Sequence, residues 1–347
     1  MQRRGSQFAR YRTFRPAWVL LAAIFLCAAP AVLRAQEVTE PPSEEIVANL
    51  AAGRVVIAVV KDAIIVATVE NPIESQTHPP IPVELNSRRV GVLLGAIDWF
   101  SPSSEVQVAR LDKELPHLRA NVLTANPQSE SGPAPNEATD LESVGQGVLL
   151  RLNHVASSLH EKVDWPADEP VVQLILAGFV PNYGPEVWQL TFGLTQEMRK
   201  LDYYDTHVTR PVYLQFWPPE KNQLHSLIEF QYPPAAKSPT LLELLRNKDP
   251  RVEKICDSDA RMKEVAEKFL QGDYKKILPA DATQFLRAAL AAIAPPHARQ
   301  TMAIVNFDSG FEWVLRPPPE PKSTTPQETQ KDRPADAPSL LGPPSSQ

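Results

Sequence analysis

The stretch "AAGRVVIAVVKDAIIVATVE", from Ala51 to Glu70, decides the fold of this chain. Two runs of β-branched and other apolar residues, 55–60 and 63–69, lie on either side of the pair Lys61-Asp62. Neither run alternates between apolar and polar residues, and unbroken apolar runs are typical of strands that are covered on both faces. We therefore predict a β-hairpin that lies within the core of the protein.

The rest of the central chain contains further strands and several helices. The best predicted helix has one apolar stripe, whose members recur every three or four residues: Leu141, Val144, Val148, Leu152, Val155 and Leu159. Further helices are predicted at 44–52, 103–118, 259–271 and 281–293, the last with a capping box of Asp281 and Gln284. Further strands are predicted at 82–85, 90–97, 171–179, 186–193, 301–307 and 311–315. Because strands and helices do not alternate one by one, we expect the α+β class.

The N-terminal end has the pattern of an export signal. Residues 1–35 combine an arginine-rich start without acidic residues and an apolar run of 13 residues from Ala17 to Ala29. Such a run is short for a membrane helix and typical of a signal peptide. We expect cleavage after Ala35, a periplasmic or extracellular protein without an integral membrane span, and a short N-terminal segment at 36–52. Retention of the signal as a membrane anchor is the alternative.

The charge of the chain narrows the choice of partners, and its cysteine content indicates how the fold is stabilised. Removal of residues 1–35, which carry six arginines, leaves 29 basic and 41 acidic residues and a formal charge of −12. This charge argues against nucleic acid or an anionic membrane surface as the partner. Cys256 is then the one remaining cysteine, so no intramolecular disulfide is predicted and the fold depends on its apolar core.

The C-terminal end is rich in proline. Nine of the 31 residues at 317–347 are proline, mixed with serine, threonine and charged residues. Such a segment has too little apolar surface to offset the entropy lost on ordering. We therefore predict a disordered tail at 317–347 and one large domain at 53–316.

Four segments resemble proteasome-type subunits, which are members of the N-terminal-nucleophile (Ntn) hydrolase superfamily. "VVIAVVKDAIIVATVE" resembles their opening hairpin, and "ELNSRRVGVLLGAID" resembles the next hairpin. "LILAGFVPNYGPEVWQLTFG" is similar to their central strand pair. "FLQGDYKKILPADATQFLRAALAAIA" and "MAIVNFDSGFEWV" are similar to the closing helix pair and the last hairpin. The resemblance implies a four-layer αββα sandwich, in which two antiparallel sheets lie between helix layers.

The residues that the family uses for catalysis are missing. The family's nucleophile is an N-terminal threonine whose own α-amine serves as the base. That position holds Gly53 here, or Arg54 if the alignment slips by one residue. The family's active-site lysine corresponds to Ile81 or Pro82, which are both aliphatic. The resemblance therefore implies a member of the fold without the family's catalytic residues, a pseudoenzyme.

Two weak candidate sites remain. The family's acidic residue falls at Val69 or Glu70, so Glu70 is a candidate acid or base, although a surface carboxylate at a strand end is the favoured interpretation. The segment "LDYYDTH" brings together Asp202, Asp205 and His207, which are possible metal ligands, but no histidine or cysteine cluster completes the set. A solvated loop is the favoured interpretation of that segment.

An insert at 201–261 separates this chain from the family pattern, since the family has only a short connection there. The insert is rich in aromatic residues and is interpreted either as extra strands at a sheet edge or as the carrier of a specific function.

Three functions are considered. The first is an exported, non-catalytic protein of the Ntn fold that acts by binding or assembly, with an unidentified protein or peptide partner and homo-oligomers left open. The second is a secreted peptidase or amidase of the same fold with a relocated active site. The third is an envelope binding module unrelated to the family. No cofactor is predicted for any of them.

Overall fold

The computed structural model of the protein describes residues 47–71, 77–101, 106–118, 139–163, 165–166, 169–201, 203–219, 225–234 and 238–319. The predicted signal peptide and nearly all of the predicted tail lie outside these residues, as does Asp202. No helix of the described residues is long and apolar enough to cross a membrane.

The predicted hairpin forms the middle of a five-stranded antiparallel sheet. β2 (Gly53–Val60) and β3 (Ala63–Glu70) pair from Gly53 opposite Glu70 to Val60 opposite Ala63. Every residue of the two strands except Arg54 is buried, which explains why the sequence does not alternate. The sheet has the order β13-β2-β3-β14-β15, with β13 (Leu227–Tyr232), β14 (Gln300–Asn306) and β15 (Gly310–Leu315).

A second sheet of eight strands is built around β6 (Arg89–Ser101). Its order is β12-β9-β8-β6-β1-β4, and two further strands, β5 (Pro82–Asn86) and β7 (Val106–Arg110), also pair with β6. The remaining members are β12 (Val212–Trp217), β9 (Gly184–Phe192), β8 (Val172–Val180), β1 (Val47–Ala51) and β4 (Thr77–His78). All of these pairs are antiparallel except β1–β4. A separate two-stranded sheet consists of β10 (Leu194–Lys200) and β11 (Tyr203–Val208).

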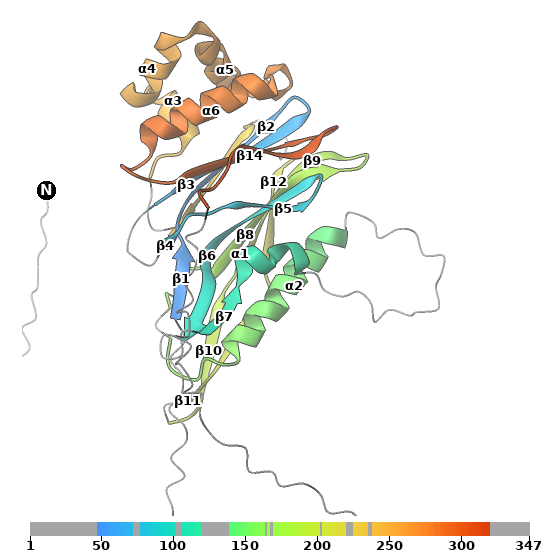
Figure 1. Cartoon of the computed structure of the whole chain (residues 1–347), viewed down its shortest axis with the longest axis vertical. Coiled ribbons are helices and arrows are strands. Elements are labelled where there is room, and N and C mark those ends of the chain that lie inside the picture. The colour runs from blue at the N-terminus through green and yellow to red at the C-terminus, as the bar shows by residue number, and fades with distance from the viewer. Residues whose placement is uncertain are drawn as a thin grey trace, which may run out of the picture. The chain divides into compact units, whose positions relative to one another are not determined.

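The side chains of β2 divide between two apolar cores. Val55, Ile57 and Val59 pack with residues of β6 and β8, between the two large sheets. Val56, Ala58 and Val60 pack on the opposite face, against helices from the C-terminal part of the chain. These helices are α3 (Leu241–Arg246), α4 (Pro250–Ser258), α5 (Ala260–Gln271) and α6 (Pro279–Ile293), and Figure 1 shows them over the sheet that contains β2, β3 and β14.

A third core lies on the other face of the eight-stranded sheet. The predicted stripe of α2 (Thr139–Ala156) packs there against β6, β8 and β9, together with α1 (Leu111–Glu114) and the 3₁₀ helix η1 (Leu115–His117). Val144, Val148 and Leu152 are fully buried in this contact, so the predicted helix is confirmed. The described chain is therefore a mixed α+β protein with antiparallel sheets, as expected.

Two predicted helices are wrong over the residues that the structure describes. A helix was predicted at 44–52, but residues 47–51 form the strand β1, which pairs with β6. Residues 106–110 form β7, and the helical turn begins only at Leu111. In both places pairing with β6 outweighs the helix propensity of alanine, leucine and glutamate, since propensity is a weak preference. Ser103 and Ser104, the expected caps, lie outside the described residues.

Helix α6 also differs from the prediction at its start. It begins at Pro279 with Leu278 as its N-cap residue, so Asp281 and Gln284 do not form a capping box. Proline at the first helical position has a preset φ and does not need an N–H partner, which allows this earlier start. A complete capping box occurs instead at α3, between Thr240 and Glu243.

The insert at 201–261 contributes an edge strand to each large sheet. β12 pairs with β9 at the edge of the eight-stranded sheet, and β13 pairs with β2 at the edge of the five-stranded sheet. This agrees with the interpretation of the insert as extra edge strands. The segment also supplies α3 and α4, which the sequence did not predict.

We expect the contact between α6 and the five-stranded sheet to be a main source of stability. Phe285 of α6 is fully buried and lies 5.8 Å from Phe269 of α5, measured between ring centroids. The variant Phe285→Ala should lower the free energy of unfolding by about 3–5 kcal/mol, because it removes buried contacts and leaves a cavity. Urea denaturation should measure this loss. Arg287→Ala, at an exposed position of the same helix, should change the value by less than about 0.5 kcal/mol.

Candidate functional site

The start of β2 lies beside a small cavity. The walls come from the start of β2, the end of β3, β13 and the residues that follow α6, and they include Gly53, Glu70, Gln231 and Pro295. The cavity volume is about 110 Å³. Sites for drug-sized ligands enclose roughly 300–1,000 Å³, so this cavity has room only for a few water molecules or one small chemical group.

The backbone at Gly53 leaves no room for a side chain. Its φ is +156°, and a Cβ atom built on it would lie 2.2 Å from the carbonyl oxygen of Val69 on the neighbouring strand. Carbon and oxygen atoms cannot approach so closely without a shift of the backbone. A threonine, serine or cysteine at this position would therefore have to push β2 and β3 apart.

The peptide bond before Gly53 is also buried. Ala51 and Ala52 have relative exposures of 0% and 1%, and the carbonyl oxygen of Ala52 accepts a hydrogen bond of 3.0 Å from the N–H of Asn71. β1, which ends at Ala51, is paired with β6 in the other sheet. The chain thus passes from one sheet to the other at Ala52, and a free amine at Gly53 would require cleavage of a buried bond in this crossing.

Glu70 is buried, with a relative exposure of 5%, so its interpretation as a surface carboxylate is wrong, and its side chain forms an ion pair with Arg299. Its carboxylate accepts a hydrogen bond of 2.8 Å from Nε of Arg299 and further bonds from Nη2 and the backbone N–H of the same residue. Burial by itself would raise the pKa of Glu70, but these hydrogen bonds and the charges of Arg299 and His78 hold the pKa below its ordinary value. A carboxylate with a lowered pKa and both oxygens engaged is a weak general base, so the candidate role of Glu70 loses support.

Arg54, the alternative nucleophile position, belongs to a second ion pair. Its Nε lies 3.0 Å from Oε1 of Glu229 on β13. Burial raises the pKa of Glu229 above its ordinary value, although Arg54, the N–H of Leu241 and Gln231 act in the opposite sense. This pair joins β2 to β13 and to the start of α3, which is a structural role.

The predicted lysine positions lie away from the cavity at Gly53. Ile81 and Pro82 line a different groove of about 480 Å³, together with Phe311 and Trp313 of β15. Neither residue carries an amine, and neither belongs to the walls around Gly53. The structure thus brings Gly53 and Glu70 together but separates them from Ile81 and Pro82.

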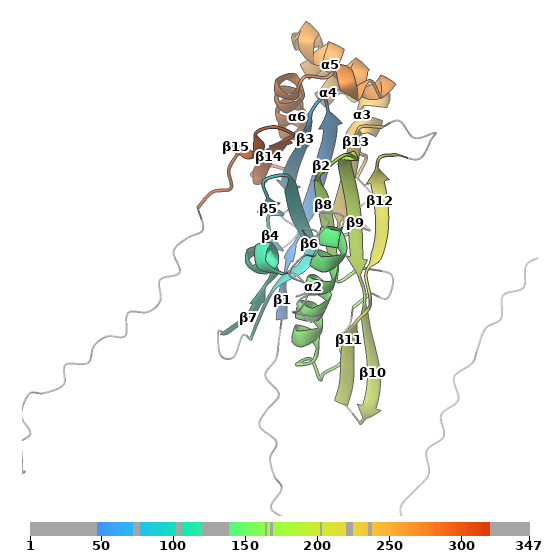
Figure 2. The same ribbon diagram turned by 90° about the vertical axis from the view of Figure 1, so that its right-hand side faces the viewer.

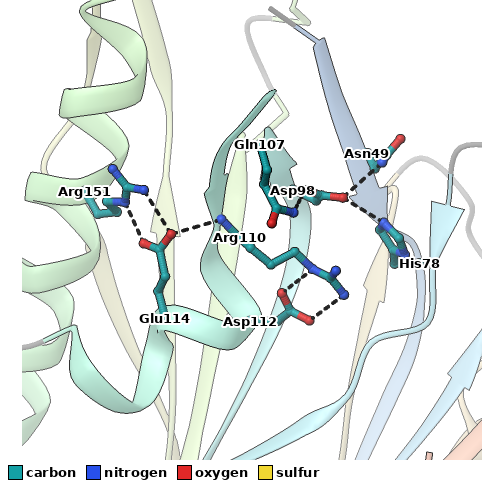
Figure 3. Close-up of polar contacts among 8 residues, drawn as sticks. All are labelled: Asn49, His78, Asp98, Gln107, Arg110, Asp112, Glu114 and Arg151. Carbon is teal, nitrogen blue, oxygen red and sulfur yellow. Dashed lines mark hydrogen bonds and ion pairs between the residues drawn. The ribbon is translucent and has the colours of Figure 1, made fainter. Parts of the chain in front are cut away.

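A polar cluster around the buried Asp98 is the feature that the sequence did not reveal (Figure 3). Asp98, on β6, accepts hydrogen bonds of 3.1 Å from Nδ2 of Asn49 on β1 and 2.8 Å from Nε2 of Gln107 on β7. Its Oδ2 lies 3.0 Å from Nε2 of His78 on β4. Burial opposes ionisation, but these bonds and the charge of Arg110 lower the pKa of Asp98 to about 2.

The cluster around Asp98 adjoins two ion pairs, Arg110–Asp112 and Glu114–Arg151, and the second of these reaches α2. Nε of Arg110 donates to Asp112 at 2.8 Å, and the backbone N–H of Arg110 donates to Glu114 at 3.1 Å. Glu114 in turn pairs with Arg151 of α2 (Figure 3). The Glu114 pKa is lowered by its bonds to Arg151, and the Arg151 pKa is raised by the same pair. The set connects β1, β4, β6, β7, α1 and α2 through charged and amide side chains.

The candidate metal ligands do not form a metal site in the residues that the structure describes. Asp205 and His207 lie on β11, so the prediction of a solvated loop is wrong for these residues. Asp205 pairs with Arg199 at 2.8 Å and with His207 at 3.2 Å. Hydrogen bonds from Arg199 lower the pKa of the exposed Asp205 carboxylate. Among the described residues no group of three or more histidine, cysteine, aspartate or glutamate side chains is arranged to hold an ion.

Comparison of the sequence with models of known protein families and with curated proteins finds no match. The function of the protein is therefore inferred from its sequence and from the arrangement of its residues.

Substitution of Gly53 should destabilise the fold whatever the new side chain offers chemically. We expect Gly53→Ala and Gly53→Thr to lower the free energy of unfolding by about 3 kcal/mol or more, because the added Cβ collides with the Val69 carbonyl. Gly184→Ala is the matched control, since Gly184 also has a positive φ but no atom within 4 Å of the added Cβ. Its loss should be about 1 kcal/mol, measured by urea denaturation.

The Asp98 cluster should make stability depend on pH at the acidic end. The folded-state pKa of about 2 lies below the ordinary value of 3.8, so the carboxylate stabilises the fold above pH 3.8 and this contribution is lost as the pH falls towards 2. At pH 7 the variant Asp98→Asn should be less stable than the natural protein by about 2 kcal/mol. Urea denaturation at several pH values should show the two proteins converging near pH 2. A difference in the free energy of unfolding that stays constant with pH would contradict the role of Asp98 in this pH dependence.

Proposed function

We propose that the chain is an exported, non-catalytic relative of proteasome-type Ntn hydrolases that acts by binding or assembly. The fold part of this proposal is supported by the position of the helices. α3–α6 pack on the outer face of the five-stranded sheet, α1 and α2 pack on the outer face of the eight-stranded sheet, and the inner faces pack on each other. This is the arrangement expected of the family's αββα sandwich.

The main support for a non-catalytic protein is the backbone conformation at Gly53. The family mechanism needs a hydroxyl or thiol and a free α-amine on the first residue of this strand. At Gly53 the Val69 carbonyl occupies the place of a side chain, and the preceding peptide bond is buried. Both requirements conflict with the packing of β2 against β3, so a single substitution would not restore the site.

The neighbours of Gly53 support the same conclusion. The lysine that keeps the amine basic has no counterpart at Ile81 or Pro82, which line another groove. Glu70 is neutralised by Arg299. Catalytic groups that act as a unit lose nearly all activity when one member is missing, and here at least two are missing.

Export is supported by the arginine-rich start and the 13-residue apolar run of residues 1–35. The absence of a disulfide framework does not conflict with export, because three apolar cores provide the stability of the described domain. The proposed mature chain begins at Gln36.

The alternative of a relocated hydrolase site has its best support at His78. Its imidazole is held by the buried Asp98, which is how a carboxylate orients a general base. Within the described part of the chain, however, no serine, threonine or cysteine is hydrogen-bonded to that imidazole. The non-catalytic proposal is therefore preferred.

The test uses the mature protein from a host that exports the full-length chain. N-terminal sequencing should give a start at about Gln36. Incubation with fluorogenic peptide amides should give no turnover, and an electrophilic inhibitor directed at N-terminal threonine should leave the intact mass unchanged. An active N-terminal-threonine hydrolase treated in parallel is the positive control.

Two results would contradict the proposal in different ways. A mature chain that starts at residue 53 or 54, or a covalent adduct between Gly53 and Glu70, would show that the strand start is catalytic. Turnover that is lost in His78→Ala, in a protein whose circular dichroism is unchanged, would favour the relocated site.

A further inference from the structure

Strand β12 is an edge of the eight-stranded sheet. It pairs with β9 on one side, and no other described strand pairs with it on the other side. Figure 2 shows it at the margin of the sheet, next to β9. An edge strand presents backbone N–H and C=O groups that can pair with another strand.

One face of β12 carries apolar side chains that are exposed. Val212, Leu214 and Phe216 have relative exposures of 57%, 47% and 36%. Tyr213, which alternates with them, packs on the opposite face in the core beside α2. The exposed side chains therefore form a row along one side of the strand, and Phe216 at its end contacts Phe230 of β13 at 4.9 Å between ring centroids.

β12 carries no charged side chain, unlike the other described edge strands that are longer than the two-residue strand β4. Charged residues commonly prevent edge strands from pairing with other chains. Charged residues occur in the other edge strands of more than two residues, for example Glu229 in β13, Glu312 in β15, Glu84 in β5, Arg110 in β7 and Arg199 in β10. The segment from Pro211 to Pro219 contains no acidic residue, basic residue or histidine.

We propose that β12 pairs with β12 of a second copy of the chain, antiparallel and around a two-fold axis at Leu214. In this register Leu214 lies opposite Leu214 of the second copy, and Val212 lies opposite Phe216. The exposed rows of the two copies then meet on the same face, because a two-fold axis perpendicular to the sheet keeps each side chain on its own face. The contact is isologous, so it closes as a dimer.

Charge favours this edge over the rest of the surface. The full chain has a formal charge of −6, and without residues 1–35 the charge is −12, so two copies repel each other over most orientations. Pairing at Pro211–Pro219 brings no charged side chain of either copy opposite another. Self-association at this edge therefore meets less electrostatic repulsion than it would at the sheet edges that carry charged side chains.

The size of the contact predicts a weak dimer. Six residues span about 20 Å of strand, and a bulge between Gln215 and Trp217 limits the regular part. One strand pair buries less than the roughly 1,200–2,000 Å² of a standard stable interface. We therefore expect a dissociation constant in the range of about 1–100 μM, with monomers at low concentration. This proposal rests on β12 alone and is independent of the chemistry at Gly53.

The test is sedimentation velocity of the mature protein between about 1 and 200 μM. The natural protein should change from monomer to dimer across this range. Leu214→Lys and Leu214→Glu should each remain monomeric, because like charges then face each other across the axis. An equimolar mixture of the two should form a heterodimer. Leu150→Lys, at an exposed leucine of α2, is the matched control and should dimerise normally.

Cysteine cross-linking checks the register in a Cys256→Ser background. Leu214→Cys should form a disulfide-linked dimer under mild oxidation, because opposite Cα atoms of an antiparallel pair are about 4.5–5.5 Å apart. Val212→Cys should not link to itself, because two copies of that residue would be about 14 Å apart along the strand. A protein that stays monomeric at 200 μM, or a mixture of the charged variants that stays monomeric, would overturn the proposal. So would a dimer that all these variants leave intact.

Discussion

The whole fold depends on the close pairing of β2 with β3, two strands that are buried on both faces. Each must present side chains to the core between the sheets and to the core beneath the C-terminal helices at once. At Gly53 the two strands leave no room for a side chain, because the Val69 carbonyl occupies the space of a Cβ. The same packing that orders both cores therefore removes the room that a catalytic side chain would need.

The elements that could be predicted from sequence are those whose pattern has a single physical explanation. The apolar runs at 55–60 and 63–69 are too long and too rich in β-branched residues for a loop, and the stripe from Leu141 to Leu159 has only a helical period. β1 and β7 could not be predicted, because their short segments are strands only through pairing with β6. Local propensity does not contain that information.

The site was predicted only in part for a similar reason. Gly53 and Glu70 were predicted as site positions because the hairpin that contains them resembles the opening hairpin of the family. Asp98 and His78 are 20 residues apart, and Gln107 and Asn49 come from two further strands. No spacing along the chain indicates such a cluster, since it exists only after four strands have met. The partner of Glu70, Arg299, is likewise 229 residues away.

The pairing of β3 with β14 has a consequence for the biogenesis of the protein. Thr68 on β3 and Thr301 on β14 share a hydrogen bond of 2.7 Å although 233 residues separate them. The central strand of the five-stranded sheet thus lacks one neighbour until nearly the whole domain has been synthesised. Contacts of such long sequence separation form slowly. The five-stranded sheet can therefore be completed only after β14 and β15 have been synthesised, and until then β3 presents an open apolar strand edge, the kind of edge on which partly folded chains aggregate.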